Sequence, residues 1–264
     1  MGEIFNDSTT AQIDARLHRD ILAHEDRIEQ IVIIVIILLI IIFRGWILYW
    51  LKFGVAIPST IELKPINVIE EPIQTNYTPE VQEQKTFTYK SLINNNTMEL
   101  IPQAHYKLSG TVVAFNHDFL FISKYFDSAA LYDLGLSWGE LADPDFFKKY
   151  IKIYSQKVEV TGSRRLNWQW KSNIPLTGEY INSHISHTHI IPANNNIMAA
   201  MLKLKLYEKV TVEGELVDII YPNTKMPKYY TSMSRKDTDA SSRGSGACET
   251  LYVTKVKIGN MIYK

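Results

Sequence analysis

Three of the seven histidines lie close together in the second half of the chain, and they are the residues best placed to do chemistry. If residues 185–191 form a strand, His187 and His189 point to the same face because side chains alternate, whereas His184 points to the opposite face. Two imidazoles two residues apart can bind one metal ion together with a third ligand from elsewhere in the fold. The alternative, which the sequence favours, is a polar network in which these histidines hydrogen-bond to the backbone and stabilise the loop before Pro192.

The single cysteine, Cys248, follows a glycine-rich run at residues 244–247 and precedes a predicted strand. A nucleophilic thiol needs a base to take up its proton, and His184 or His189 is the obvious candidate. A metal-binding or hydrolytic site built from these three residues is therefore an alternative function. One cysteine excludes a disulfide framework, and its position before a strand is also typical of a small buried core residue.

Two tryptophans and two charged residues are candidates for binding. Trp168 and Trp170 share one face of a predicted strand, where they pack in the core or form a platform for a small ligand or an oligosaccharide. Arg235 and Asp237 lie in a long polar loop. Either Arg235 helps the glycine-rich run at residues 244–246 to bind an anion, or it forms a salt-bridged pair with Asp237. The acidic residues have no spacing typical of a catalytic pair, so we expect no catalytic residue and no cofactor.

The elements that must position these residues fall within residues 103–264, which we expect to be one soluble domain. Alternation and β-branched residues predict strands, and N-cap signals with apolar periodicity predict helices. The predicted strands are residues 106–115, 158–161, 166–171, 209–220 and 249–258, and the predicted helices are 128–141, 145–150 and 197–206. Because these elements do not alternate as βαβ units, we expect an α+β fold with two or three helices. Its sheet should be curled and mostly antiparallel, resembling an OB-like barrel.

A long apolar run precedes this domain. Residues 31–43 are all apolar, and after two residues the apolar character resumes as far as position 51. A helix over 31–51 would be roughly 31 Å long at about 1.5 Å per residue, enough to cross a bilayer core. Aromatic residues near its end resemble an interfacial belt. The residues that mark this predicted membrane anchor are Ile31, Phe43, Arg44, Trp46, Trp50 and Leu51.

The segments on either side of this apolar run are predicted to be a helical tail before it and an extended linker after it. Residues 1–30 are predicted to form a cytoplasmic helical tail, because apolar residues recur near one stripe among charges. Prolines at 58, 65, 72 and 79 recur every seven residues, which excludes a helix and predicts an extended linker over residues 52–102. The distribution of Lys and Arg orients the anchor only weakly. We expect a single-pass protein of the bacterial inner membrane type with a periplasmic C-terminal domain.

A chain of short motifs resembles a family of uncharacterised bacterial proteins that are membrane-anchored or exported and have one α+β domain. The motifs are LSWGELADP at 136–144, YSQ at 154–156, WQW at 168–170, HISHTHIIPA at 184–193, GELV at 214–217, SRKD at 234–237 and GSGACETLYV at 244–253. In the family pattern His184 and His189 match, whereas Asn usually stands at position 187. No activity is assigned to the family, so the resemblance implies membership and no reaction.

Composition limits the remaining possibilities. Lys and Arg number 28 and Asp and Glu number 28, and this zero net charge argues against nucleic-acid binding through bulk positive charge. Hydrophobic residues make up 46% of the chain, which excludes a largely disordered protein. We therefore expect a non-catalytic interaction or scaffold protein, a subunit of a larger membrane or envelope assembly. Its expected partners are the lipid bilayer and other membrane or envelope proteins.

Overall fold

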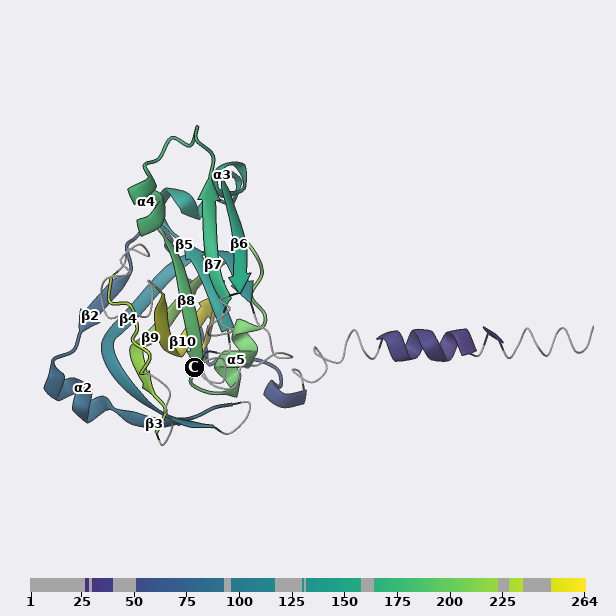
Figure 1. Ribbon diagram of the computed structural model, residues 1–264, viewed down its shortest axis with the longest axis horizontal. Helices are drawn as coiled ribbons and strands as arrows, with labels where there is room; N and C mark the ends of the chain where they lie inside the picture. Colours follow the sequence, from purple (N-terminus) through teal and green to yellow (C-terminus); the bar gives the residue numbers. More distant parts are fainter. Residues whose placement is uncertain are drawn as a thin grey trace, which may run out of the picture. The chain divides into compact units, whose positions relative to one another are not determined.

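The computed structural model describes most of the chain after residue 50 and part of it before (Figure 1). The described residues are 27, 28, 30–39, 51–92, 96–116, 130, 132–157, 164–222, 228–234 and 248–264. They divide into two compact units, Met1–Leu51 and Lys52–Lys264. The second unit is a mixed, sheet-rich α+β fold, and it carries every element discussed below except the short apolar helix of the first unit.

Five strands of the second unit form a closed ring of pairings. They are β4 (Thr97–Asn116), β5 (Tyr132–Ser137), β8 (Ile185–Pro192), β9 (Lys209–Ile220) and β10 (Glu249–Ile258). β4 pairs with β5 and β9, β10 pairs with β9 and β8, and β8 pairs with β5. The β8–β10 pairing is parallel and the other four are antiparallel. With helix α5 (Asn195–Met201) between β8 and β9 along the chain, this arrangement is that of an OB-type barrel.

Strand β4 closes the barrel because it serves two neighbours in succession. Residues Glu99 to Thr111 pair with β9, and Thr111 to Asn116 pair with β5, so β4 curves around the barrel (Figure 1). A Cβ atom at Gly110 would lie 2.9 Å from the carbonyl oxygen of Ser137, which is too close for any other residue. The glycine therefore allows β4 to approach β5 at the point where it changes partner.

The hairpin of β6 (Ile151–Lys157) and β7 (Arg164–Trp170) shows which face of the barrel strands is the outer one. This hairpin is a separate two-stranded sheet, and the backbone N–H of Leu166 donates to Nδ1 of His187 at 3.4 Å. The face that carries His187 is therefore outside the barrel. Side chains on the opposite face are wholly buried and fill the interior. They include Leu134, Leu136, Ile190, Leu216, Leu251 and Val253.

Helices and one 3₁₀ turn connect these strands near the hairpin (Figure 1). They are η2 (Gly139–Ala142), α3 (Pro144–Tyr150) and α4 (Gly178–Ser183). Asp143 caps α3, because its carboxylate accepts hydrogen bonds from the backbone of Asp145 at 2.8 Å and Phe146 at 2.9 Å. The helix predicted over residues 128–141 is wrong, since described residues there form β5 and η2. The pairing of β5 with β4 and β8 outweighs its local helical pattern.

Residues 52–102, predicted as an extended linker, contain short elements in the structure. They are β1 (Thr60–Ile61), β2 (Ile73–Asn76), α2 (Pro79–Lys85), β3 (Phe87–Lys90) and the start of β4. β2 and β3 pair with β4, and β1 pairs with β11 (Met261–Tyr263), which in turn pairs with β10. The proline spacing excludes a long helix over this range, but it leaves room for short strands at sheet edges and for a helix that begins at Pro79.

The predicted membrane-spanning helix over residues 31–51 is wrong, and with it the transmembrane part of the predicted fold class and the inner-membrane localisation. Within the described residues, no helix has both the length and the apolar character needed to cross a bilayer. Residues 30–39 are helical, and residues 40–50 lie outside the described part of the chain. Phe43, Arg44, Trp46 and Trp50 lie outside the described residues, as does most of the predicted tail over residues 1–30.

Candidate metal centre

Strand pairing brings an acidic residue and two histidines together on the outer face of β5 and β8. His187 and His189 lie two residues apart on β8, and their ring centroids are 4.5 Å apart. Across the antiparallel β5–β8 pair, Asp133 lies opposite His189 and Gly135 lies opposite His187. The three functional side chains therefore share one face of neighbouring strands.

Asp133 joins the two histidines. Its Oδ1 atom lies 2.6 Å from Nδ1 of His189 and 3.6 Å from Nε2 of His187. The short contact uses Nδ1 of His189, so Nε2 is the ring nitrogen on the side away from Asp133. The side chains are mostly enclosed, with 1% of His187, 11% of His189 and 16% of Asp133 exposed.

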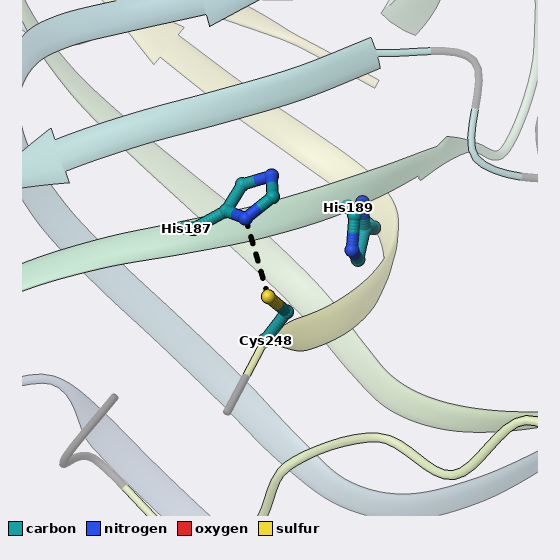
Figure 2. Close-up of side chains that lie close together, drawn as sticks. All are labelled: His187, His189 and Cys248. Carbon is teal, nitrogen blue, oxygen red and sulfur yellow. Dashed lines mark hydrogen bonds between the residues drawn. The ribbon is translucent and has the colours of Figure 1, made fainter. Parts of the chain in front are cut away.

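Cys248 completes the cluster from a third strand. It immediately precedes β10, whose parallel pairing with β8 places Thr250 beside His189. The Sγ atom lies 3.2 Å from Nδ1 of His187, and Figure 2 shows the thiol pointing toward that ring with His189 beside it. One ligand atom from each of His187, His189 and Cys248 lies within 4.8 Å of the other two. We call these three residues the His–His–Cys cluster.

Burial and mutual charge set the pKa values of the cluster. Burial raises the pKa of the Cys248 thiol, but the neighbouring histidines outweigh it and hold this pKa well below its ordinary value. Burial lowers the pKa of His189, yet the Asp133 carboxylate raises it overall to about 10. Burial likewise raises the pKa of Asp133, and the two imidazoles bring it below its usual range. Without a metal, the cluster therefore favours a thiolate and a carboxylate beside protonated imidazole.

Glu249 follows Cys248 but belongs to the other face of the sheet. It lies beside Thr188 in the parallel pairing, so its side chain points away from His187 and His189. Its Oε2 atom is buried without a hydrogen-bond partner among the described residues, and burial raises its pKa to about 8. Glu249 is therefore a buried carboxyl group beneath the cluster and not a fourth ligand.

His184 lies apart from the His–His–Cys cluster, unlike its sequence neighbours. It follows the last residue of α4, stacks on Tyr180 with 3.7 Å between ring centroids, and contacts Oε1 of Glu71 through Nε2 at 3.0 Å. Glu71 also accepts a hydrogen bond from the Trp138 indole at 3.2 Å. His184 thus holds the segment around Glu71 against the domain.

The other predicted binding residues lie at separate places. Trp168 and Trp170 are both on β7, where the Trp168 indole donates to Oδ1 of Asn182 at 3.0 Å and Trp170 is 39% exposed. Arg235 and Asp237 lie outside the described residues. Asp133 lies in the site although it was not among the residues predicted from the sequence. The alternation of polar and apolar residues through β5 is the signal that could have placed Asp133 on a polar face.

Comparison of the chain with protein-family models, curated proteins and solved structures found no match. The family resemblance drawn from the sequence motifs therefore stays a prediction. The function is therefore inferred below from the geometry of the site.

Proposed function

We propose that this domain binds a divalent transition-metal ion, with zinc as the best fit, through the His–His–Cys cluster. The observation that carries the proposal is the convergence of two imidazole nitrogens and one thiol sulfur within 4.8 Å of one another. Around a tetrahedral zinc ion, with Zn–N about 2.0 Å and Zn–S about 2.3 Å, ligand atoms lie roughly 3.5 Å apart. Small side-chain rotations therefore suffice to close the site around an ion.

The type of ligand favours zinc over the common hard cations. Thiolate and imidazole are the donors typical of zinc sites, whereas calcium and magnesium prefer oxygen ligands. In the proposed site Cys248 provides Sγ and His187 provides Nδ1, the atom nearest the sulfur. The metal then replaces the long 3.4 Å hydrogen bond that this nitrogen accepts from the Leu166 backbone. His189 provides Nε2, since its Nδ1 atom is engaged by Asp133.

Asp133 fits the role of the carboxylate that stands behind a metal-binding histidine. A hydrogen bond from Nδ1–H to a carboxylate fixes the tautomer, so that Nε2 carries the lone pair for the metal. Three protein ligands leave one position of a tetrahedral ion for water or another small ligand. Asp133 keeps 16% and His189 keeps 11% of its side chain exposed, so the cluster is not wholly sealed from solvent.

The experiment is elemental analysis of the purified full-length chain after zinc loading and desalting. We expect about one zinc per chain in the wild type and in His184→Gln, a matched variant of the histidine that lies outside the cluster. Cys248→Ser and His189→Gln should lose most of the metal. Cobalt substitution should give a thiolate charge-transfer band that Cys248→Ser lacks. Retention of stoichiometric metal by both cluster variants, or no metal in the wild type, would overturn the proposal.

A second candidate function rests on the same thiol. Sγ of Cys248, the His187 ring and Oδ1 of Asp133 form a chain with contacts of 3.2 Å and 3.6 Å, the order of groups in a thiol hydrolase. Ester hydrolysis that survives a chelator and disappears in Cys248→Ser would favour this function over metal binding. In this arrangement the base is His187 and not His184. The interaction or scaffold role expected from the sequence stays a prediction.

A further inference from the structure

A second candidate site lies on the outer face of β4, β9 and β10. Residues of the segment 62–73 line one side of a partly open cavity of about 130 Å³ there. Lysine side chains and hydroxyl groups form the floor of this cavity, which we call the lysine cavity. Its floor is lined by Lys107, Ser109, Thr211, Glu213, Lys255 and Lys257, and residues within 62–73 line the rest. None of these residues belongs to the His–His–Cys cluster.

The two hydroxyl groups at the floor of the cavity have one O–H donor that their mutual hydrogen bond does not use. Ser109 and Thr211 face each other across the β4–β9 pairing, with 2.8 Å between Oγ and Oγ1. Either hydroxyl can donate to the other, but only one proton can lie between the two oxygens. The accepting hydroxyl therefore keeps its own proton available for a ligand.

Two of the lysines are held by carboxylates, and both retain spare N–H groups. Nζ of Lys257 lies 3.1 Å from Glu62 and donates to the backbone carbonyl of Lys64 at 2.5 Å, and its side chain is 8% exposed. Nζ of Lys255 lies 3.0 Å from Glu213. Because an ammonium group has three N–H donors, Lys257 has one left and Lys255 has two.

Lys107 supplies a further positive charge at the floor of the cavity. It is half-buried and lies opposite Glu213 in the β4–β9 register. Within the part of the chain that the structure describes, its ammonium group makes no ion pair or hydrogen bond, while Glu213 is paired with Lys255. Its N–H groups can therefore donate to an anion that enters the cavity.

We propose that the lysine cavity binds a small oxyanion, of the carboxylate, phosphate or sulfate class, between Lys107 and the Ser109–Thr211 hydroxyl pair. The floor offers N–H donors of the lysines and one O–H donor of the hydroxyl pair, which an oxygen-rich anion can accept. One bound water needs a cavity of about 10–15 Å³. The lysine cavity, at about 130 Å³, therefore has room for a small anion with part of its hydration shell. Glu70 and Glu71 also line the cavity and disfavour larger polyanions.

The test uses the full-length chain and three probes, namely sodium phosphate, sodium sulfate and sodium acetate. Binding is measured by calorimetric titration and by thermal unfolding, with sodium chloride at equal ionic strength as the reference. We expect at least one of the three oxyanions to bind in preference to chloride. Lys107→Met, which keeps the aliphatic stem and removes the charge, should weaken that binding at least tenfold. Lys90→Met, at an exposed position on β3, is the matched control and should bind like the wild type.

Further variants keep the proposal testable if Lys107→Met does not fold. Lys107→Arg should retain binding because it keeps the charge and the donors, and Thr211→Val should weaken it by disrupting the hydroxyl pair. The proposal is wrong if chloride protects as well as every oxyanion, or if Lys107→Met and Thr211→Val both bind like the wild type. The titrations are repeated in Cys248→Ser with a chelator present. An unchanged result there separates the lysine cavity from the metal proposal.

Discussion

Asp133 and His189 form a short contact, 2.6 Å between Oδ1 and Nδ1, although 56 positions separate them in the chain. The contact exists because β5 and β8 pair with these two residues directly opposite each other. It fixes which nitrogen of His189 faces the His–His–Cys cluster. The register of one strand pair thus determines the orientation of a candidate metal ligand.

Asp133→Asn should weaken zinc binding without abolishing it. The amide cannot hold the His189 ring with the same charge-assisted hydrogen bond, and loss of such a partner costs about ten- to hundredfold in metal affinity. The measurement is competition with a chromophoric chelator. Asp145→Asn, an exposed acidic residue of α3, should leave the affinity unchanged. Equal affinities for Asp133→Asn and the wild type would exclude the orienting role of Asp133.

Removal of the metal should lower the thermal stability of the wild type. A ligand that binds only the folded state stabilises it by about 4 kcal/mol when present at a thousand times its Kd. We therefore expect a strong chelator to lower the Tm of the zinc-loaded protein by several degrees. In Cys248→Ser the chelator should have no effect, because little metal is bound. An equal shift in both proteins would mean that the stabilising ion lies elsewhere.

Local patterns in the sequence predict much of the barrel. The predicted strands 209–220 and 249–258 coincide with β9 and β10, and the helix predicted over residues 145–150 lies within α3. The spacing of His187 and His189 places both rings on one face, as the structure shows. These features depend on alternation, turn chemistry and caps, which are properties of short segments.

The parts that the sequence did not predict depend on contacts between distant segments. Asp133 joins the two histidines only through the β5–β8 register, and Cys248 reaches them only because β10 runs parallel to β8. His184 was grouped with its neighbours in sequence, but it lies at the end of α4 and contacts Glu71 instead. Sequence spacing cannot reveal pairings that are set by tertiary packing.

The apolar run near the start of the chain shows the same limit in another form. Its length and composition predicted a membrane-spanning helix, whereas no helix within the described residues is both long and apolar enough to cross a bilayer.

Gly214→Ala should destabilise the barrel strongly. A Cβ atom at this position would collide with the backbone carbonyl oxygen of Tyr252 on the neighbouring strand β10. Backbone cannot move aside as a flexible side chain can, so we expect a loss of about 2–4 kcal/mol in the free energy of unfolding. Urea denaturation measures this loss. Gly178→Ala, where the nearest atom is 3.2 Å away on the Trp170 ring, should change it by less than about 1 kcal/mol.

In the metal-free protein, the Asp133–His189 pair should contribute most to stability in mildly acidic solution. The pKa of His189 rises from 6.5 to about 10 on folding, so its contribution to stability is complete below about pH 6.5 and is lost as pH rises toward 10. The pKa of Asp133 falls from 3.8, so its contribution is present above that pH and is lost in stronger acid.

The measurement is urea unfolding of the chelator-treated wild type at about pH 6 and about pH 9. The lowered pKa of the Cys248 thiol acts in the opposite direction over this range, so the comparison is between variants. We expect the change in stability from about pH 6 to about pH 9 to be less favourable in the wild type than in His189→Gln, which has no imidazole proton to lose. His184→Gln is the matched control and should follow the wild type. Zinc should reverse the trend, because protons compete with the metal for imidazole and thiolate and binding tightens as pH rises. If His189→Gln and the wild type lose equal stability, the ion pair is not the source of the pH dependence.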